Sequence, residues 1–95
     1  MRHRKDSNQT EVVQGLRDRG ISVAITSNVG SGFPDLVLGY KGFNYLCELK
    51  DGKKPPSKRK LTPAEQDFKC DWTGNYFVAN NLHEILYLIG WKKDD

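Results

Sequence analysis

The 95-residue chain lacks most of the features that identify secreted, zinc-binding and membrane proteins. Its two cysteines, Cys47 and Cys70, belong to no CxxC or Cys/His pattern of the kind that binds zinc, so both are expected to be reduced thiols packed in the interior. No segment approaches the roughly 18 consecutive apolar residues of a membrane-spanning helix, and the charged residues 1–6 lead into polar residues instead of a signal-peptide core. The sequence therefore predicts a cytoplasmic protein.

Net charge and histidine content are also low. Fifteen Lys and Arg residues oppose twelve Asp and Glu residues, which leaves a formal net charge of +3, and neither His3 nor His83 has a neighbour that suggests metal or base chemistry. A chain of this length forms one small core and leaves much of its surface exposed, so residues 1–95 are expected to form a single domain that pairing with a second copy would stabilise. Residues 1–7 are expected to be a disordered tip.

The positive charge is concentrated in one segment. Residues 51–60 are interrupted by the Pro55-Pro56 pair and are expected to form an irregular loop, here called the basic loop. A run of this kind is usually a solvated loop, but clustered lysines and arginines can also contact a polyanion such as a nucleic-acid backbone, and the sequence leaves both interpretations open. The basic residues that would contact such a backbone, that of DNA included, are Lys53, Lys54, Lys58, Arg59 and Lys60.

Local patterns predict an α/β fold with the order helix, three strands, helix, strand, helix. The start of the second helix is clearly marked. Thr62 can act as the N-cap, Pro63 is favoured as the first helical residue, and Glu65 is the acidic residue expected at the third helical position. Asn8 and Glu11 have the spacing of a capping box at the start of the first helix. The expected segments are a helix over 8–20, a half-buried strand over 21–26, a hairpin over 36–49, a helix over 62–72, a buried strand over 76–79 and a helix over 81–90.

The predicted hairpin brings two carboxylates together. A two-residue loop at Lys41-Gly42 places Asp35 directly opposite Glu48, on the same face of the sheet. Opposed Cβ atoms lie about 5 Å apart, where two carboxylates repel by roughly 3 kcal/mol at an effective dielectric constant of about 20. We therefore expect a cation beside them.

Two kinds of cation would satisfy that expectation. Lys50 lies on the same face two residues beyond Glu48, and a structural ion pair with Lys50 would need nothing more. The alternative is a divalent metal, because the carboxylates of Asp35 and Glu48, with the backbone carbonyl of Leu49, suit Mg²⁺ or Mn²⁺. The metal is favoured because the opposite face of the hairpin is apolar and must be buried. In a sheet that is covered on both sides, three charged groups at one end are costly unless they have a function. The residues of that apolar face, all expected to be buried, are Leu36, Leu38, Tyr40, Phe43, Tyr45, Cys47 and Leu49.

These residues match a known pattern. Pro34-Asp35 followed by Glu48-Leu49-Lys50 resembles the PD-(D/E)xK nuclease superfamily, and the segments 32–36 and 61–66 resemble its virus-type replication-repair branch (VRR-NUC). The resemblance extends from about residue 8 to about residue 90. It implies a restriction-endonuclease-like αβββαβα core, in which helices flank a mixed sheet, and a nuclease that uses Mg²⁺ or Mn²⁺.

The resemblance adds two residues to the candidate site. It implies that Glu11 of the first helix joins the metal site, either through water or at a second ion, although local physics assigns Glu11 to the capping box with Asn8. It also implies a role for Gln66, which would otherwise be a solvated side chain in the first turn of its helix. Whether one metal ion or two act stays open. The full catalytic set is Glu11, Asp35, Glu48, Lys50 and Gln66.

Together these features predict hydrolysis of phosphodiester bonds in DNA. Asp35 and Glu48 would hold the ion, Lys50 would orient the attacking water or stabilise charge on the phosphorus, and the basic loop would contact the backbone without reading its sequence. The resemblance favours a homodimeric Holliday-junction resolvase, an enzyme that cuts four-way DNA junctions. The alternatives are a flap or duplex nickase of the same superfamily, a nucleic-acid-binding module without catalysis, and a scaffold that associates through Trp72 and Trp91.

Overall fold

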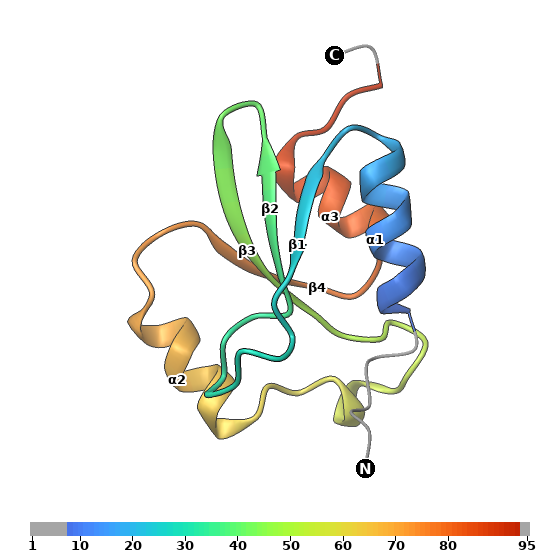
Figure 1. The fold of residues 1–95 in the computed structure, drawn as a ribbon. Helices are drawn as coiled ribbons and strands as arrows, with labels where there is room; N and C mark the ends of the chain where they lie inside the picture. The colour runs from blue at the N-terminus through green and yellow to red at the C-terminus, as the bar shows by residue number, and fades with distance from the viewer. Residues whose placement is uncertain (1–7, 94–95) are drawn as a thin grey trace.

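The structure is a computed structural model that describes residues 8–93, so the expected tip at residues 1–7 lies outside the described residues. One four-stranded mixed sheet is flanked by three helices, which confirms the predicted α/β class (Figure 1). None of the helices within this range combines the length and the apolar character needed to cross a membrane. The elements are α1 (Gln9–Asp18), β1 (Ser22–Ile25), β2 (Leu36–Tyr40), β3 (Phe43–Leu49), the 3₁₀ turn η1 (Pro56–Lys58), α2 (Pro63–Asp71), β4 (Tyr76–Ala79) and α3 (Leu82–Ile89).

The sheet has the strand order β1-β2-β3-β4. β1 and β3 each pair with β2 in the antiparallel direction, whereas β4 pairs with β3 in the parallel direction. A parallel pair needs a long crossover between its strands, and here the crossover consists of residues 50–75, which include the basic loop and α2. The basic loop, which is expected to meet DNA, therefore leaves the sheet at the end of β3, and α2 follows it.

The turn between β2 and β3 has the predicted two-residue form. Lys41 has a φ of 52° and Gly42 a φ of 85°, so both residues occupy the left-handed region that a type I′ turn requires. The register pairs Leu36 with Cys47, as predicted. This turn decides which side chains share a face along the whole hairpin.

The hydrophobic core lies between the sheet and the pair of helices α1 and α3 (Figure 1). The predicted apolar face of the hairpin is buried only in its inner part, because Phe43 directly follows the turn and is 60% exposed. Ile25 is also 47% exposed, because it lies on the edge strand β1, and in the predicted buried strand β4 only Ala79 is buried. The buried hydrophobic residues are Val12, Val13, Leu16, Ile21, Leu36, Leu38, Leu46, Cys47, Leu49, Ala79, Ile85 and Ile89.

The second face of the sheet, which was also predicted to be covered, is covered only in part: Leu46 and Glu48 of β3 are buried on it. α2 lies apart from α1 and α3, has no buried residue, and leaves Ala24 of β1 exposed (Figure 1). α2 is attached instead to the loop between β1 and β2. A Cβ atom at Gly32 would overlap the carbonyl of Ala64, and the φ of +80° at Gly32 also favours glycine. The rings of Phe33 and Phe68 pack edge to face beside this contact, with centroids 5.3 Å apart.

Candidate active site

The hairpin register places Asp35, just before β2, opposite Glu48 of β3. Leu36 pairs with Cys47 and both face the core, so the adjacent pair lies on the opposite face of the sheet. Asp35 is held there by its Oδ2 atom, which accepts a hydrogen bond of 2.9 Å from the backbone N–H of Leu49. The structure thus brings the two predicted carboxylates to one face.

Lys50 follows on the same face and contacts two acids. Its Nζ atom lies 3.4 Å from Oε2 of Glu48 and 2.9 Å from Oε1 of Glu65. Burial lowers the pKa of Lys50, but the hydrogen bond to Glu65 and the charge of Glu48 outweigh burial and raise this pKa above its ordinary value. Lys50 is therefore a permanent positive charge inside an acidic cluster.

Sequence patterns assigned Glu65 to helix capping alone, but in the structure it has a second role. The predicted capping box is present at the start of α2: the backbone N–H of Thr62 donates to Oε1 of Glu65 at 2.9 Å, and the backbone N–H of Glu65 donates to Oγ1 of Thr62 at 3.2 Å. The same Oε1 atom accepts the hydrogen bond from Lys50. Burial raises the pKa of Glu65, but the bonds from Thr62 and Lys50 outweigh burial and lower it. The capping box is thus the sequence signal that could have identified Glu65 as a site residue.

Glu48 is buried, and only 3% of its side chain is exposed. Burial is the main reason why the pKa of Glu48 rises to about 9, and the charge of Asp35 and a hydrogen bond with Glu65 add to it; Lys50 opposes the rise without reversing it. At neutral pH Glu48 therefore holds a proton, and the ion pair of the cluster is that between Lys50 and Glu65. The 3.4 Å contact between Lys50 and Glu48 agrees with this assignment, because a neutral carboxyl oxygen also accepts from an ammonium group.

Neighbouring groups respond to the same acidic cluster. Burial raises the pKa of Tyr76, at the start of β4, to about 12, and the charges of nearby carboxylates, that of Glu48 first, contribute. Burial and nearby carboxylates likewise raise the pKa of the Cys47 thiol, so Cys47 is the packed, reduced residue that was predicted. Cys70 is exposed, contrary to the prediction, because α2 has no buried face.

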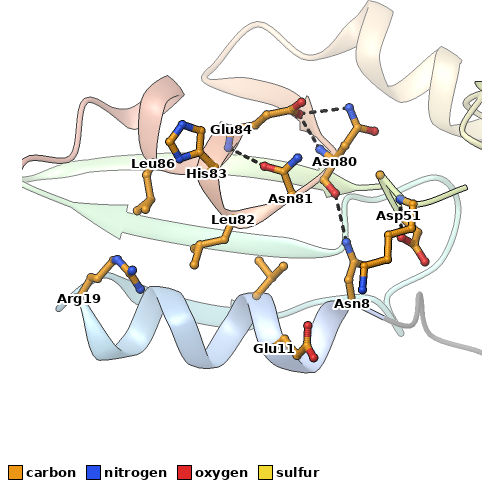
Figure 2. A pocket seen from close by; sticks show the side chains of 13 residues that line it. Asn8, Glu11, Arg19, Asp51, Asn80, Asn81, Leu82, His83, Glu84 and Leu86 are labelled. Atoms are coloured by element: carbon orange, nitrogen blue, oxygen red, sulfur yellow. Dashed lines mark hydrogen bonds between the residues drawn. The ribbon is translucent and has the colours of Figure 1, made fainter.

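Glu11 does not join this cluster. It is exposed and lines a separate hollow between α1, the start of α3 and the basic loop, as Figure 2 shows. The predicted capping box is absent, because Nδ2 of Asn8 instead donates to the carbonyls of Lys50 at 3.3 Å and Asn80 at 3.2 Å. Gln9, which is 3% exposed, is the inward-facing polar residue in the first turn of α1. The rotation of the helix therefore turns Glu11 toward solvent.

Gln66 also points away from the carboxylates. Its side chain is exposed, and its Nε2 atom lies 3.5 Å from Sγ of Cys70, one turn further along α2. One residue rotates a helix by about 100°, so Gln66 leaves α2 in a different direction from Glu65, which contacts Lys50. The residue that α2 contributes to the cluster is Glu65.

The basic loop continues from Lys50 and has a defined conformation. Asp51 is 5% exposed, and its Oδ1 atom accepts a hydrogen bond of 2.9 Å from the backbone N–H of Lys53. Nε of Arg59 donates to the carbonyl of Lys54 at 2.9 Å, so Arg59 braces the loop. The basic side chains that stay exposed, and that could meet phosphate, are Lys53, Lys54, Lys58 and Lys60.

Known proteins provide no template for this site. No protein-family model, curated protein or solved structure matches the chain. Within residues 8–93, no group of three or more His, Cys, Asp or Glu side chains has an arrangement that could hold a metal ion. Asp35 and Glu48 nevertheless face each other, and Mg²⁺ usually takes one or two protein carboxylates and completes its shell with water and substrate phosphate. The donors, and the repulsion that raises the pKa of Glu48, fit a hard divalent cation.

Proposed function

We propose that the protein is a metal-dependent endonuclease that hydrolyses phosphodiester bonds in DNA. The supporting observation is that Asp35 and Glu48 face each other while Nζ of Lys50 lies 3.4 Å from Glu48, at the base of the basic loop. A phosphodiester needs charge stabilisation at the reacting group and positive charge along its backbone, and this end of the sheet offers both. The same proposal assigns the chain to the VRR-NUC branch of the PD-(D/E)xK superfamily and to the cytoplasm.

Each residue of the cluster has a separate task in this proposal. Asp35 and Glu48, with the backbone carbonyl of Leu49, would hold Mg²⁺ or Mn²⁺, which supplies charge stabilisation to the phosphate and makes water more acidic. Lys50 directs its ammonium group to the same place and stabilises negative charge that develops on the phosphate oxygens. Glu65 positions Lys50 through their 2.9 Å ion pair.

Branched DNA and a homodimer complete the proposal. The exposed lysines of the basic loop would contact the sugar-phosphate backbone, which favours recognition of DNA shape over base sequence. A two-fold dimer would match the two-fold symmetry of a four-way junction and would place one site on each of two strands. A protein that light scattering shows to be a strict monomer, and that cuts linear duplex as readily as a junction, would remove the resolvase assignment alone.

Cleavage by matched variants tests the proposed function. Asp35→Asn and Glu48→Gln remove a charge with little change in shape, and each should lower the rate of junction cleavage in Mg²⁺ by roughly a hundredfold or more. Binding of the same junction in EDTA should persist in both variants. Asp18→Asn is the control, because Asp18 is exposed on α1, where it accepts a hydrogen bond from Gln14.

The outcomes separate the rival functions. Wild-type cleavage rates in Asp35→Asn and Glu48→Gln, or undiminished cleavage in EDTA, would refute the proposed function. Junction binding without any cleavage, in the wild type as well as in both variants, would identify a binding module that lacks catalysis.

A further inference from the structure

A pair of aromatic rings, the half-buried Phe68 and the exposed Trp72, forms a platform at the end of α2. The two rings are stacked, with centroids 5.3 Å apart and an angle of 15° between their planes, and Trp72 is 44% exposed. Phe68 also contacts Tyr76, with ring centroids 6.0 Å apart. In the parallel ladder between β3 and β4, Tyr76 pairs with Leu46 and Val78 with Glu48, so Tyr76 shares the face of Glu48 and the inner end of this row of rings adjoins the candidate active site.

The platform is ordered before any ligand arrives. The backbone N–H of Trp72 donates to the carbonyl of Phe68 at 3.0 Å, which holds the backbone of Trp72 on the last turn of α2. The chain then passes close to the edge of the indole, where a Cβ atom at Gly74 would lie 2.9 Å from Nε1 of Trp72. A ring that is already held in place loses little conformational entropy when a second ring stacks on it.

The hollow beside the platform favours a base over a phosphate. Its lining includes Phe68 and Trp72 together with the carboxylates of Asp67 and Asp71. Two carboxylates repel a phosphate group. A nucleobase instead offers a flat face to the indole and, in cytosine, adenine or guanine, amino hydrogens to the carboxylates.

We propose that Phe68 and Trp72, flanked by Asp67 and Asp71, bind one unstacked nucleobase of the DNA strand that is cut. The inference rests on the proposed function and specifies its substrate. Glu65 lies in the first turn of α2 and Trp72 is the C-cap residue of the same helix, seven residues or about 10 Å further along its axis, so the base belongs to a nucleotide close to the reacting phosphate. Single-stranded segments and branch points, where bases are already unstacked, are therefore preferred over continuous duplex.

Fluorescence of Trp72 tests this binding in EDTA, where cleavage does not interfere. The chain has two tryptophans, so Trp91→Phe leaves Trp72 as the reporter. The probes are an oligodeoxycytidylate of about 12 nucleotides, an abasic strand of equal length and a blunt duplex. The oligodeoxycytidylate should quench the fluorescence of Trp72, and the abasic strand should not.

The affinity of the Trp72→Ala variant provides the second measurement. It should bind the oligodeoxycytidylate roughly 5- to 150-fold more weakly than wild type, which corresponds to about 1–3 kcal/mol for one stacked base. Its affinity for the blunt duplex should not change, and Trp72→Phe should retain most of the single-strand affinity. Circular dichroism spectra identical to that of the wild type will establish that the variants are folded.

The contrary results are distinct. Equal binding of the oligodeoxycytidylate and the abasic strand, or unchanged single-strand affinity in Trp72→Ala, would overturn the base platform, while cleavage that depends on Asp35 and Glu48 would still support the nuclease. A lower solution mass for Trp72→Ala in light scattering would assign the platform to subunit contact and would also overturn it. A wild-type protein that binds none of the three probes and cuts no DNA would contradict the proposed function itself.

Discussion

Replacement of Glu48 by glutamine should stabilise the metal-free protein at neutral pH. The pKa of Glu48 is about 9 in the folded protein, against an ordinary value of 4.5. Between these two values the folded state binds more protons than the unfolded state, so the free energy of unfolding falls as the pH rises through this window. Glutamine keeps the shape and the hydrogen-bonding capacity of the protonated side chain and has no proton to lose.

The magnitude follows from the linkage between proton binding and folding. Each pKa unit corresponds to about 1.4 kcal/mol, so the wild type loses at most about 3 kcal/mol by pH 7. This loss is the upper limit of what the substitution can recover, so we expect Glu48→Gln to gain about 1–3 kcal/mol at pH 7. For a domain of this size, each kcal/mol raises Tm by about 4–8 °C.

Urea denaturation in EDTA at pH 5, 7 and 9, followed by circular dichroism, measures this effect. The advantage of Glu48→Gln over wild type should grow from pH 5 to pH 9, whereas the exposed control Asp18→Asn should follow wild type at all three values. A Glu48→Gln protein that is less stable than wild type at pH 7, or whose stability changes with pH as steeply as that of the wild type, would refute the assigned protonation state. Addition of Mg²⁺ should stabilise wild type more than Glu48→Gln, because the variant lacks one of the two carboxylates.

Contrasts between similar residues test other parts of the structure. Glu65→Gln should lower kcat by roughly tenfold because Lys50 loses its ionic partner, whereas Gln66→Ala should leave kcat unchanged. Equal effects of the two substitutions in steady-state kinetics would disprove the role of Glu65 in positioning Lys50. Neutralising two exposed lysines of the basic loop should reduce the slope of the log of the DNA-binding constant against log salt by roughly 0.9 per lysine, for every DNA shape. Arg59→Gln should instead chiefly lower Tm. An unchanged slope in filter binding would mean that the loop is only solvated. Gly20→Ala should cost about 1 kcal/mol of stability, because Gly20 has a positive φ. Gly32→Ala should cost clearly more, because Gly32 also has a positive φ and lies against the backbone of Ala64. Similar melting temperatures of the two variants would contradict this packing.

The sequence predicted the fold best where a short pattern decides the geometry. Lys41-Gly42 prefers a type I′ turn, and that turn alone sets the register that opposes Asp35 and Glu48. The exposure of Phe43 could not be predicted in the same way, because alternation assigns a face to each residue but does not reveal how far the helices extend over that face.

The candidate site was harder to predict, because it depends on the rotation of two helices. Gln9 and Glu11 lie in one turn of α1, and packing of the whole apolar stripe buries the first and exposes the second. Glu65 and Gln66 are adjacent in α2, and the capping box directs Glu65 toward Lys50. A local pattern can favour a polar residue for a helix start, but the tertiary contact that gives it a further role depends on where the helix is attached.

The charges of the cluster explain why Lys50 alone does not complete the site. Lys50 is already engaged by Glu65, and Glu48 keeps a pKa of about 9 in spite of the nearby ammonium group. With Glu48 protonated, the four side chains of Asp35, Glu48, Lys50 and Glu65 carry a net charge of minus one; with Glu48 ionised, they would carry minus two. A divalent cation that displaces the proton of Glu48 would bring the cluster to neutrality, which neither proton nor lysine achieves. The structural ion pair and the proposed metal site, which the sequence presented as alternatives, are therefore compatible: Lys50 pairs with Glu65, and a divalent cation would bind at the opposed carboxylates of Asp35 and Glu48.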